Sequence, residues 1–161
     1  MRAGRRLPDL GPRGEGWFLI QVVLMATIAV AGLLGPAWSG WLRAFGMLVG
    51  AALIAAGGVL AIRGVVDLGG LITPFPKPRD GAELVDTGGY AVVRHPIYGG
   101  LILGGIGWGL ATASPASLAA AVVLGLFFDL KSRREEAWLL QRLPGYESYR
   151  RRTRRLLPWL Y

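Results

Sequence analysis

Three long stretches without charge organise the hydrophobic pattern of this chain. Residues 16–42, 44–62 and 96–128 contain no Asp, Glu, Lys or Arg. A helix needs about 20 predominantly apolar residues to cross about 30 Å of hydrocarbon. Each of the first two stretches therefore predicts one membrane-spanning helix, and we place these helices at residues 16–36 and 43–62.

The third uncharged stretch is too long for a single crossing, because as one helix it would extend for about 50 Å. Ser114 and Pro115 divide it: serine is a good N-cap, and proline is a good first helical residue. We therefore predict two further spans, at residues 97–113 and 115–131.

The remaining segments are predicted to be polar connections to this membrane domain. Residues 63–95 form a loop that contains the proline-rich run 73–81, which we interpret as an extended connector. Residues 132–161 form a basic tail that starts as a helix and is interrupted at Pro144. The predicted fold is thus an all-α integral membrane protein, a single domain over residues 1–161, with about four transmembrane helices and a cytoplasmic C-terminal helical extension.

Composition supports a membrane protein and excludes several kinds of chemistry. The chain is 53% hydrophobic, with a mean hydropathy of +0.44, which is too apolar for an ordinary soluble domain. It has no cysteine, so disulfides and thiolate nucleophiles are excluded. A single histidine argues against a histidine-based zinc site, and we expect no bound metal.

Basic residues are distributed very unequally along the chain. Seventeen of the 18 Lys and Arg residues precede the first span, lie in the central loop or follow the fourth span, and only Arg43 falls in a short connection on the other face. This bias is typical of cytoplasmic segments. The net charge of +8 coincides with long apolar runs. We therefore expect the basic segments to face a lipid bilayer and not to bind nucleic acid. Both termini and the central loop are predicted to be cytoplasmic, in a bacterial inner or cell membrane.

Candidate chemistry lies at the predicted cytoplasmic ends of the last two spans. Pro96 keeps His95 out of helical geometry and suits the first turn of a helix. Arg94 and His95 are therefore presented at a helix N-terminus, which favours an anion. Glu135 and Glu136, on the helix that leaves the fourth span, can face an ammonium or sulfonium group.

Each of these residues also has a purely structural interpretation. Arg94 suits a positive-inside anchor, and His95 suits a hydrogen bond to a backbone carbonyl. A glutamate pair among arginines is typical of a solvated helix face. The combination is more specific, because an acidic pair then lies beside the only histidine of the chain.

The pattern of these motifs resembles a known family. Arg94-His95-Pro96-x-Tyr98-x-Gly100 follows Gly89-Tyr90 and precedes Glu135-Glu136-x-x-Leu139 and Tyr146-x-x-Tyr149. This two-part pattern, over residues 85–158, resembles the isoprenylcysteine carboxyl methyltransferases, which are related to the phospholipid methyltransferases. The resemblance implies a small multi-helix membrane protein with S-adenosyl-L-methionine in a cytosol-facing pocket between the last two helices and the C-terminal segment.

The resemblance also implies roles for individual residues. It places His95, Pro96 and Tyr98 against the cofactor, and Glu135 near the methionine ammonium. Lys131 matches a position at which the eukaryotic enzymes use arginine toward the substrate carboxylate. Arg94 and Lys131 are thus the predicted catalytic residues, and the predicted cofactor-binding residues are Tyr90, His95, Pro96, Tyr98, Gly100, Leu103, Glu135 and Glu136.

The acceptor and two other functions stay open at this stage. The chain has Leu143-Pro144-Gly145-Tyr146 where the family often has Phe-Gly-x-x-Tyr, and it has fewer spans than the eukaryotic enzymes. The predicted acceptor is a lipophilic or prenylated small molecule. Because of these departures, isoprenylcysteine, another lipid-like acid, an amine and a phenol all stay open as its identity. The alternatives are an NADPH-dependent lipid or sterol reductase and a non-catalytic small membrane protein. No charge lies mid-span, so the pattern indicates no ion pathway.

Overall fold

The structure of the protein, a computed structural model, consists of helices joined by loops, with no strand among the residues that it describes. These residues are 7–35, 38–77, 81 and 83–158. The elements, in chain order, are α1 (Glu15–Leu34), α2 (Gly40–Leu68), the 3-10 helix η1 (Gly69–Leu71), α3 (Gly89–Val92), α4 (Pro96–Ala111), α5 (Pro115–Arg142) and α6 (Tyr146–Arg152).

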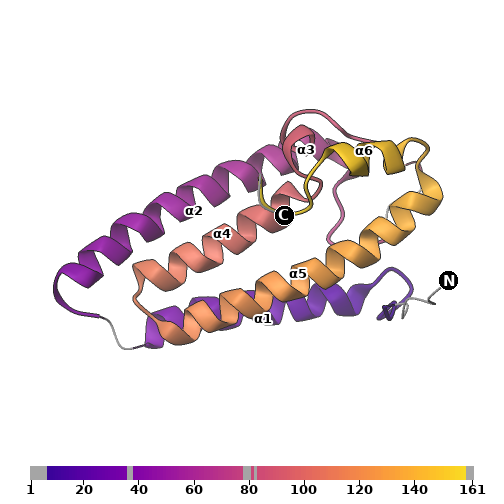
Figure 1. Cartoon of the computed structure of the whole chain (residues 1–161). Helices are drawn as coiled ribbons and strands as arrows, with labels where there is room; N and C mark the ends of the chain where they lie inside the picture. The colour runs from indigo at the N-terminus through magenta and orange to yellow at the C-terminus, as the bar shows by residue number, and fades with distance from the viewer. Residues whose placement is uncertain (1–6, 36–37, 78–80, 82, 159–161) are drawn as a thin grey trace.

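Four long helices lie side by side and bring distant segments together at one end (Figure 1). α2 packs on α4, α4 packs on α5, and α5 packs on α1. The short helices α3 and α6 lie together at the end where α2 finishes and α4 begins (Figure 1). The C-terminal segment thereby reaches the start of α4, although Arg94 and Arg154, which are hydrogen-bonded there, are 60 residues apart in the sequence.

The helices α1 and α2 and the first half of α5 are apolar on nearly all sides. α1, α2 and α5 are long and apolar enough to cross a membrane, whereas α4 is an apolar helix of 16 residues. Large hydrophobic side chains project outward along α1, α2 and α5; the Leu48 side chain on α2, for example, is 72% exposed. A helix that is apolar all round belongs in a core or in lipid, so this surface fits a membrane protein.

α2 is longer than its predicted span. We expected a loop from residue 63, but the helix continues through Arg63 and Asp67 to Leu68 and ends at Gly69, whose φ is +51°. The first charged residue ends the apolar run without ending the helix, because no residue before Gly69 breaks helical geometry. The extra turns bring the Asp67 carboxylate to the backbone N–H of Gly89, 2.6 Å away, at the start of α3.

The turn between α4 and α5 forms as its residue types predict. The Ser114 hydroxyl accepts a hydrogen bond from the backbone N–H of Ser117 at 3.2 Å, and Pro115 is the first residue of α5. α5 then continues without a break from the apolar region to Arg142 and ends two residues before Pro144, which cannot continue a helix.

Glycines allow α2 and α4 to approach at backbone distance. Gly50 and Gly57 of α2 are buried against α4. A Cβ atom added at Gly57 would lie 2.5 Å from the carbonyl oxygen of Gly100, and one added at Gly50 would lie 2.5 Å from that of Gly107. Lipid tails are as apolar as the side chains of a helix, so moving these side chains out of lipid gains no hydrophobic free energy. Close packing is therefore a main source of helix association in a membrane.

We predict that Gly57→Ala destabilises the protein and that Gly58→Ala does not. The added methyl group at Gly57 meets α4 backbone, and overpacking of this kind costs about 1–3 kcal/mol. A Cβ at Gly58 meets no atom within 4 Å. Gly58→Ala therefore causes no overpacking, and its expected effect is the higher helix propensity of alanine alone. Thermal unfolding in detergent measures both variants, and equal midpoints would contradict this account of the α2–α4 contact.

Candidate active site

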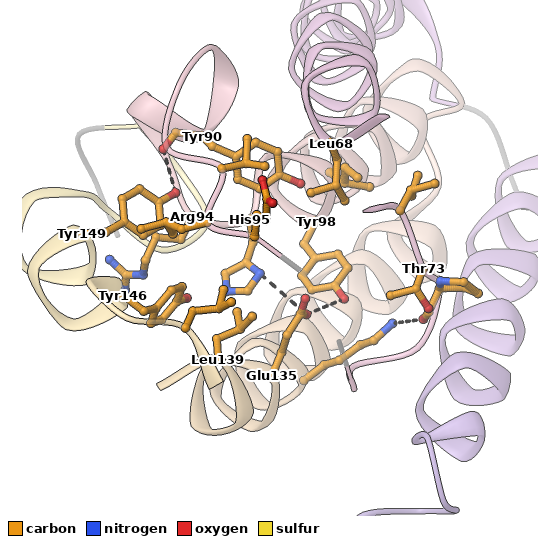
Figure 2. A pocket seen from close by; sticks show the side chains of 18 of the residues that line it. Leu68, Thr73, Tyr90, Arg94, His95, Tyr98, Glu135, Leu139, Tyr146 and Tyr149 are labelled. Carbon is orange, nitrogen blue, oxygen red and sulfur yellow. Dashed lines mark hydrogen bonds and ion pairs between the residues drawn. The ribbon is translucent and has the colours of Figure 1, made fainter. Parts of the chain in front are cut away.

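A cavity of about 410 Å³ lies where α3, α4, α5 and α6 meet. Its walls come from the ends of these helices, from the residues that follow α2 and from one residue of α1. Figure 2 shows the cavity with most of its lining side chains. Six predicted site residues line it: Tyr90, Arg94, His95, Tyr98, Lys131 and Glu135.

Glu135 stands at the centre of the polar groups that face this cavity. Its carboxylate accepts a hydrogen bond from the Tyr98 hydroxyl at 2.9 Å and lies 3.8 Å from Nδ1 of His95. Figure 2 shows the three side chains pointing toward one another. The Glu135 side chain stays 23% exposed, so part of the carboxylate is left to face the cavity.

Stacked rings fix the positions of Tyr98 and His95. The two rings are parallel, with centroids 5.4 Å apart, and the Tyr98 ring also stacks on Phe128, with centroids 4.5 Å apart. His95 is the residue before α4, where Pro96 holds it outside the helix. Tyr98 lies inside α4, and Phe128 lies on α5. The stack therefore joins both helices behind Glu135.

Lys131 brings a buried ammonium group to the cavity wall. Its residue is only 1% exposed, and Nζ lies 5.0 Å from the centroid of the Tyr98 ring. The ammonium donates to Oε1 of Gln21 on α1 at 2.6 Å and to the carbonyl oxygen of Pro74 at 3.2 Å. A buried cation needs such partners, and these two leave one of its three donors available.

Arg94, in the cavity lining, forms a buried ion pair with Glu136, which lies outside the lining. Nε of Arg94 donates to Oε1 of Glu136 at 2.8 Å, and the two side chains are 7% and 4% exposed. The same guanidinium donates to the carbonyl oxygens of Arg150, at 3.0 Å, and Thr153. His95 completes the cluster, with Nε2 3.3 Å from the Glu136 carboxylate.

Backbone contacts attach the C-terminal tail beside this ion pair. The N–H groups of Arg94 and His95 donate to the carbonyl oxygens of Arg154 and Arg155, at 2.8 and 3.0 Å. The Tyr149 hydroxyl donates to the carbonyl oxygen of Tyr90 at 2.7 Å, a contact drawn in Figure 2. Through these contacts α6 is held against α3, and its tyrosines form one wall of the cavity.

The tyrosines of this wall, and Tyr90 of α3 beside them, have raised pKa values. Burial raises the pKa of the Tyr90, Tyr146 and Tyr149 phenols above the ordinary value. For Tyr146 the charges of Glu136 and Glu135 raise the pKa further. The phenols thus keep their protons at physiological pH and present hydroxyl donors and aromatic faces.

Four of the residues predicted to bind the cofactor lie away from the cavity lining. Glu136 belongs to the ion pair with Arg94. Pro96, Gly100 and Leu103 face α2: Pro96 packs at Gly64, and Gly100 and Leu103 pack at Gly57. The cause is helical periodicity, because positions 96, 100 and 103 share one face of α4 whereas Tyr98 lies on another. Consecutive residues of a motif occupy one helix but not one face.

Several cavity residues were absent from the predicted site. Gln21 carried a signal, since it is the one amide side chain in the uncharged run 16–42, and polar residues inside a span are often functional. Pro74 contributes a backbone carbonyl from the run that we interpreted as a connector, so no side chain could have indicated it. Tyr146 and Tyr149 are part of the two-part motif but had received no role of their own.

Comparison with known proteins identifies the family. Residues 45–144, more than half of the chain, match the family model described as phospholipid methyltransferase. This match includes α4, most of α2 and all of α5, and therefore His95, immediately before α4, and the helices that carry Tyr98 and Glu135.

Two curated proteins are similar to part of the chain. The nickel-cobalt-cadmium resistance protein NccN of Alcaligenes xylosoxydans xylosoxydans is 37% identical over 84 residues, which are 51% of this chain and 39% of that protein. The cobalt-zinc-cadmium resistance protein CzcN of Cupriavidus metallidurans is 35% identical over 83 residues, 51% of this chain and 38% of that protein. The matches thus span about two fifths of the length of these relatives. On the family match, which extends over α4 and α5 and the residues of the cavity that they carry, this chain belongs to the phospholipid methyltransferase family.

Proposed function

We propose that the protein transfers a methyl group from S-adenosyl-L-methionine to a lipophilic acceptor at the membrane surface. One observation carries the proposal: the partly exposed Glu135 carboxylate, oriented by Tyr98 and His95, faces a cavity at the end of a bundle of apolar helices. Membership in the phospholipid methyltransferase family supports the reaction class.

The residues present suit this cofactor. A volume of about 410 Å³ falls within the range of about 300–1,000 Å³ for small-molecule sites. S-adenosyl-L-methionine has two cationic centres, an ammonium and a sulfonium. The Glu135 carboxylate suits the ammonium, and the neutral rings of Tyr90 and Tyr146 suit a sulfonium, since aromatic faces attract cations.

The chain's own groups would supply binding, orientation and exclusion of water. When bound, the cofactor provides an electrophilic methyl group. Glu135 would fix the orientation of the amino-acid part, and the His95–Tyr98–Phe128 stack would keep Glu135 in place. The wall formed by α6 would keep water away from the reacting atoms. Positioning in a dry cavity contributes much of the rate in such transfers.

We further propose that the acceptor carries an anionic group, as the carboxylate of isoprenylcysteine does. Lys131 is the supporting residue, because its buried ammonium has a donor left beyond those to Gln21 and Pro74. An anionic nucleophile needs no general base. A lipid amine is the second candidate, suggested by the family description, and it would have to lose a proton before transfer.

The names of the two relatives suggest a role in metal resistance, which nothing at the site favours. In the described part of the chain no group of three or more His, Asp or Glu side chains could hold a metal ion. Because the family match supports methyl transfer, we place that function first, and binding of NADPH, for the reductase alternative, is measured beside it.

We propose four membrane crossings with the cavity on the cytoplasmic side. α1, α2 and α5 have the required length, and α4 would be a fourth, shorter span, because it lies between α2 and α5 along its whole length (Figure 1). The distribution of basic residues sets the orientation. The basic tail then lies at the surface that anionic lipids make negative.

The cofactor assignment predicts unequal effects for two glutamates. Glu135→Gln should weaken binding of S-adenosyl-L-homocysteine and S-adenosyl-L-methionine by about 1.5–3 kcal/mol, the range for a hydrogen bond to a charged group. Glu147→Gln, on the half-exposed surface of α6, should change it little. Isothermal titration of purified protein in detergent measures both, with NADPH as a third ligand. Equal effects of the two changes, or tight binding of NADPH alone, would contradict the proposal.

The acceptor assignment predicts a selective effect at Lys131. Lys131→Met keeps an unbranched apolar side chain but removes the charge, so methyl transfer to a prenylcysteine carboxylate should fall by about tenfold or more, as loss of one charged contact implies. Binding of S-adenosyl-L-homocysteine should persist. Transfer of a radiolabelled methyl group to farnesylcysteine and to phosphatidylethanolamine separates the two acceptor classes. Activity on the amine lipid that is unaffected by Lys131→Met would refute the anionic acceptor.

The topology predicts that both ends of the chain lie on the same side. Reporter domains fused at Leu10 and after Tyr161 should both report the cytoplasm, because an even number of crossings returns the chain to its starting side. Opposite locations would mean an odd number of spans and would exclude α4 as a crossing.

A further inference from the structure

A second cavity, of about 310 Å³, lies deeper among the apolar helices. We call it the apolar groove. Its lining contains no charged residue and includes many small ones, among them Gly57, Gly58, Gly104 and Gly105. Larger apolar side chains complete it, including Met25, Leu101 and Trp108. Such a surface offers space and dispersion contacts but almost no hydrogen-bonding groups.

The groove lies between α1 and α2, over α4. α4 packs against α1, α2 and α5, whereas α1 and α2 make no contact with each other in the described residues. Figure 1 shows α1 and α2 on different sides of α4. Cβ atoms added at Gly58 and Gly104 would meet no atom within 4 Å, so these glycines face open space.

The apolar groove adjoins the candidate active site along α1 and α4. On α1, Gln21 lines the first cavity, and Met25, one turn later, lines the groove; the Gln21 amide contacts the Met25 sulfur at 4.0 Å. On α4, Ile97 lines the first cavity, and Leu101, one turn later, lines the groove. Both helices thus lead from the polar cavity into the apolar groove within one turn.

Trp108 closes the far end of the groove. It is the last α4 residue in the lining, and its indole N–H donates to the carbonyl oxygen of Ala29 on α1 at 3.4 Å. The indole ring therefore crosses from α4 to α1. From Tyr98 to Trp108 the helix rises about 15 Å, which is half of the roughly 30 Å hydrocarbon thickness and so the depth of one leaflet.

We propose that the apolar groove holds a single hydrocarbon chain of the acceptor lipid, and that Trp108 limits the length of chain accepted. The inference rests on the proposed function of the adjacent cavity. The head group of the acceptor would lie at Lys131, and its chain would pass Gln21 and extend to Trp108. The glycines would admit the chain, and the gap between α1 and α2 would let it enter sideways from the bilayer.

Photo-cross-linking of the full chain in phosphatidylcholine nanodiscs tests the groove. The probe is a saturated fatty acid whose diazirine lies about 15 Å from the carboxylate, the rise from Tyr98 to Trp108. We expect cross-links at groove residues near Gly104 and Trp108. Gly104→Leu should lower their yield about tenfold, which corresponds to about 1.4 kcal/mol. The matched control is Ala55→Leu, which adds a side chain at an exposed position on α2 and should leave the yield unchanged.

A second variant tests the length limit. A longer probe, with its diazirine about one turn or 5 Å farther from the carboxylate, should cross-link poorly in the wild-type groove. Trp108→Ala should allow it to label residues beyond position 108, such as Ala111. If the longer probe labels the wild type and Trp108→Ala to the same extent, Trp108 is not the limit.

Other outcomes separate this inference from the proposed function. Labelling spread evenly over the outer faces of α1 and α2, and unaffected by both Gly104→Leu and a second filling change, Gly58→Leu, would show bulk lipid contact only and overturn the groove. Binding of S-adenosyl-L-homocysteine is measured on every variant. If this binding persists while the groove stays unlabelled, the groove proposal is refuted and the proposed methyltransferase function is not. If this binding is absent while the groove is labelled, the methyltransferase function is refuted and the groove proposal is not.

Discussion

The enclosure of the cavity depends on one buried ion pair, between Arg94 before α4 and Glu136 on α5. Loss of one partner from such a pair costs about 3–5 kcal/mol, because a charge is left buried and uncompensated. Nη1 of Arg94 also donates to carbonyl oxygens of the tail, at Arg150 and Thr153. One guanidinium therefore joins α5, the start of α4 and the C-terminal segment. Together with the backbone contacts of Arg94 and His95 to the tail, it holds the wall that carries Tyr146 and Tyr149 in place.

The apolar helices are held together by different physics. Lipid removes the hydrophobic gain that drives packing in water, so α2 and α4 associate through backbone contact at Gly50 and Gly57. α1 lacks such a glycine seam with α2 and packs instead on α5, where the Ser117 hydroxyl donates to the Ile28 carbonyl at 2.9 Å. The unequal packing leaves the gap between α1 and α2, so the residue types that decide helix association also decide where the groove opens.

The sequence predicted the helices better than the faces they present. Uncharged runs and the Ser114-Pro115 pair located the long helices, because length, capping and proline are local properties. The extension of α2 beyond Arg63 was missed, since hydropathy marks the end of an apolar run and not of a helix. At the site, the motif around His95 predicted which residues approach one another, whereas Gly100 and Leu103 point to α2. Facing directions depend on tertiary packing, and the Pro74 carbonyl carries no side-chain signal at all.

The adjacent residues Glu135 and Glu136 show how one helix serves two purposes. A step of one residue turns an α-helix by about 100°, so the two carboxylates point to different environments. Glu136 is enclosed by Arg94 and His95, and its charge stabilises the fold through these contacts. Glu135 is contacted by the neutral Tyr98 hydroxyl and, at a longer distance, by His95, so its charge is positioned but not fully compensated. Glu135 therefore keeps a partly exposed carboxylate toward the cavity, because the nearby Arg94 guanidinium is paired with Glu136.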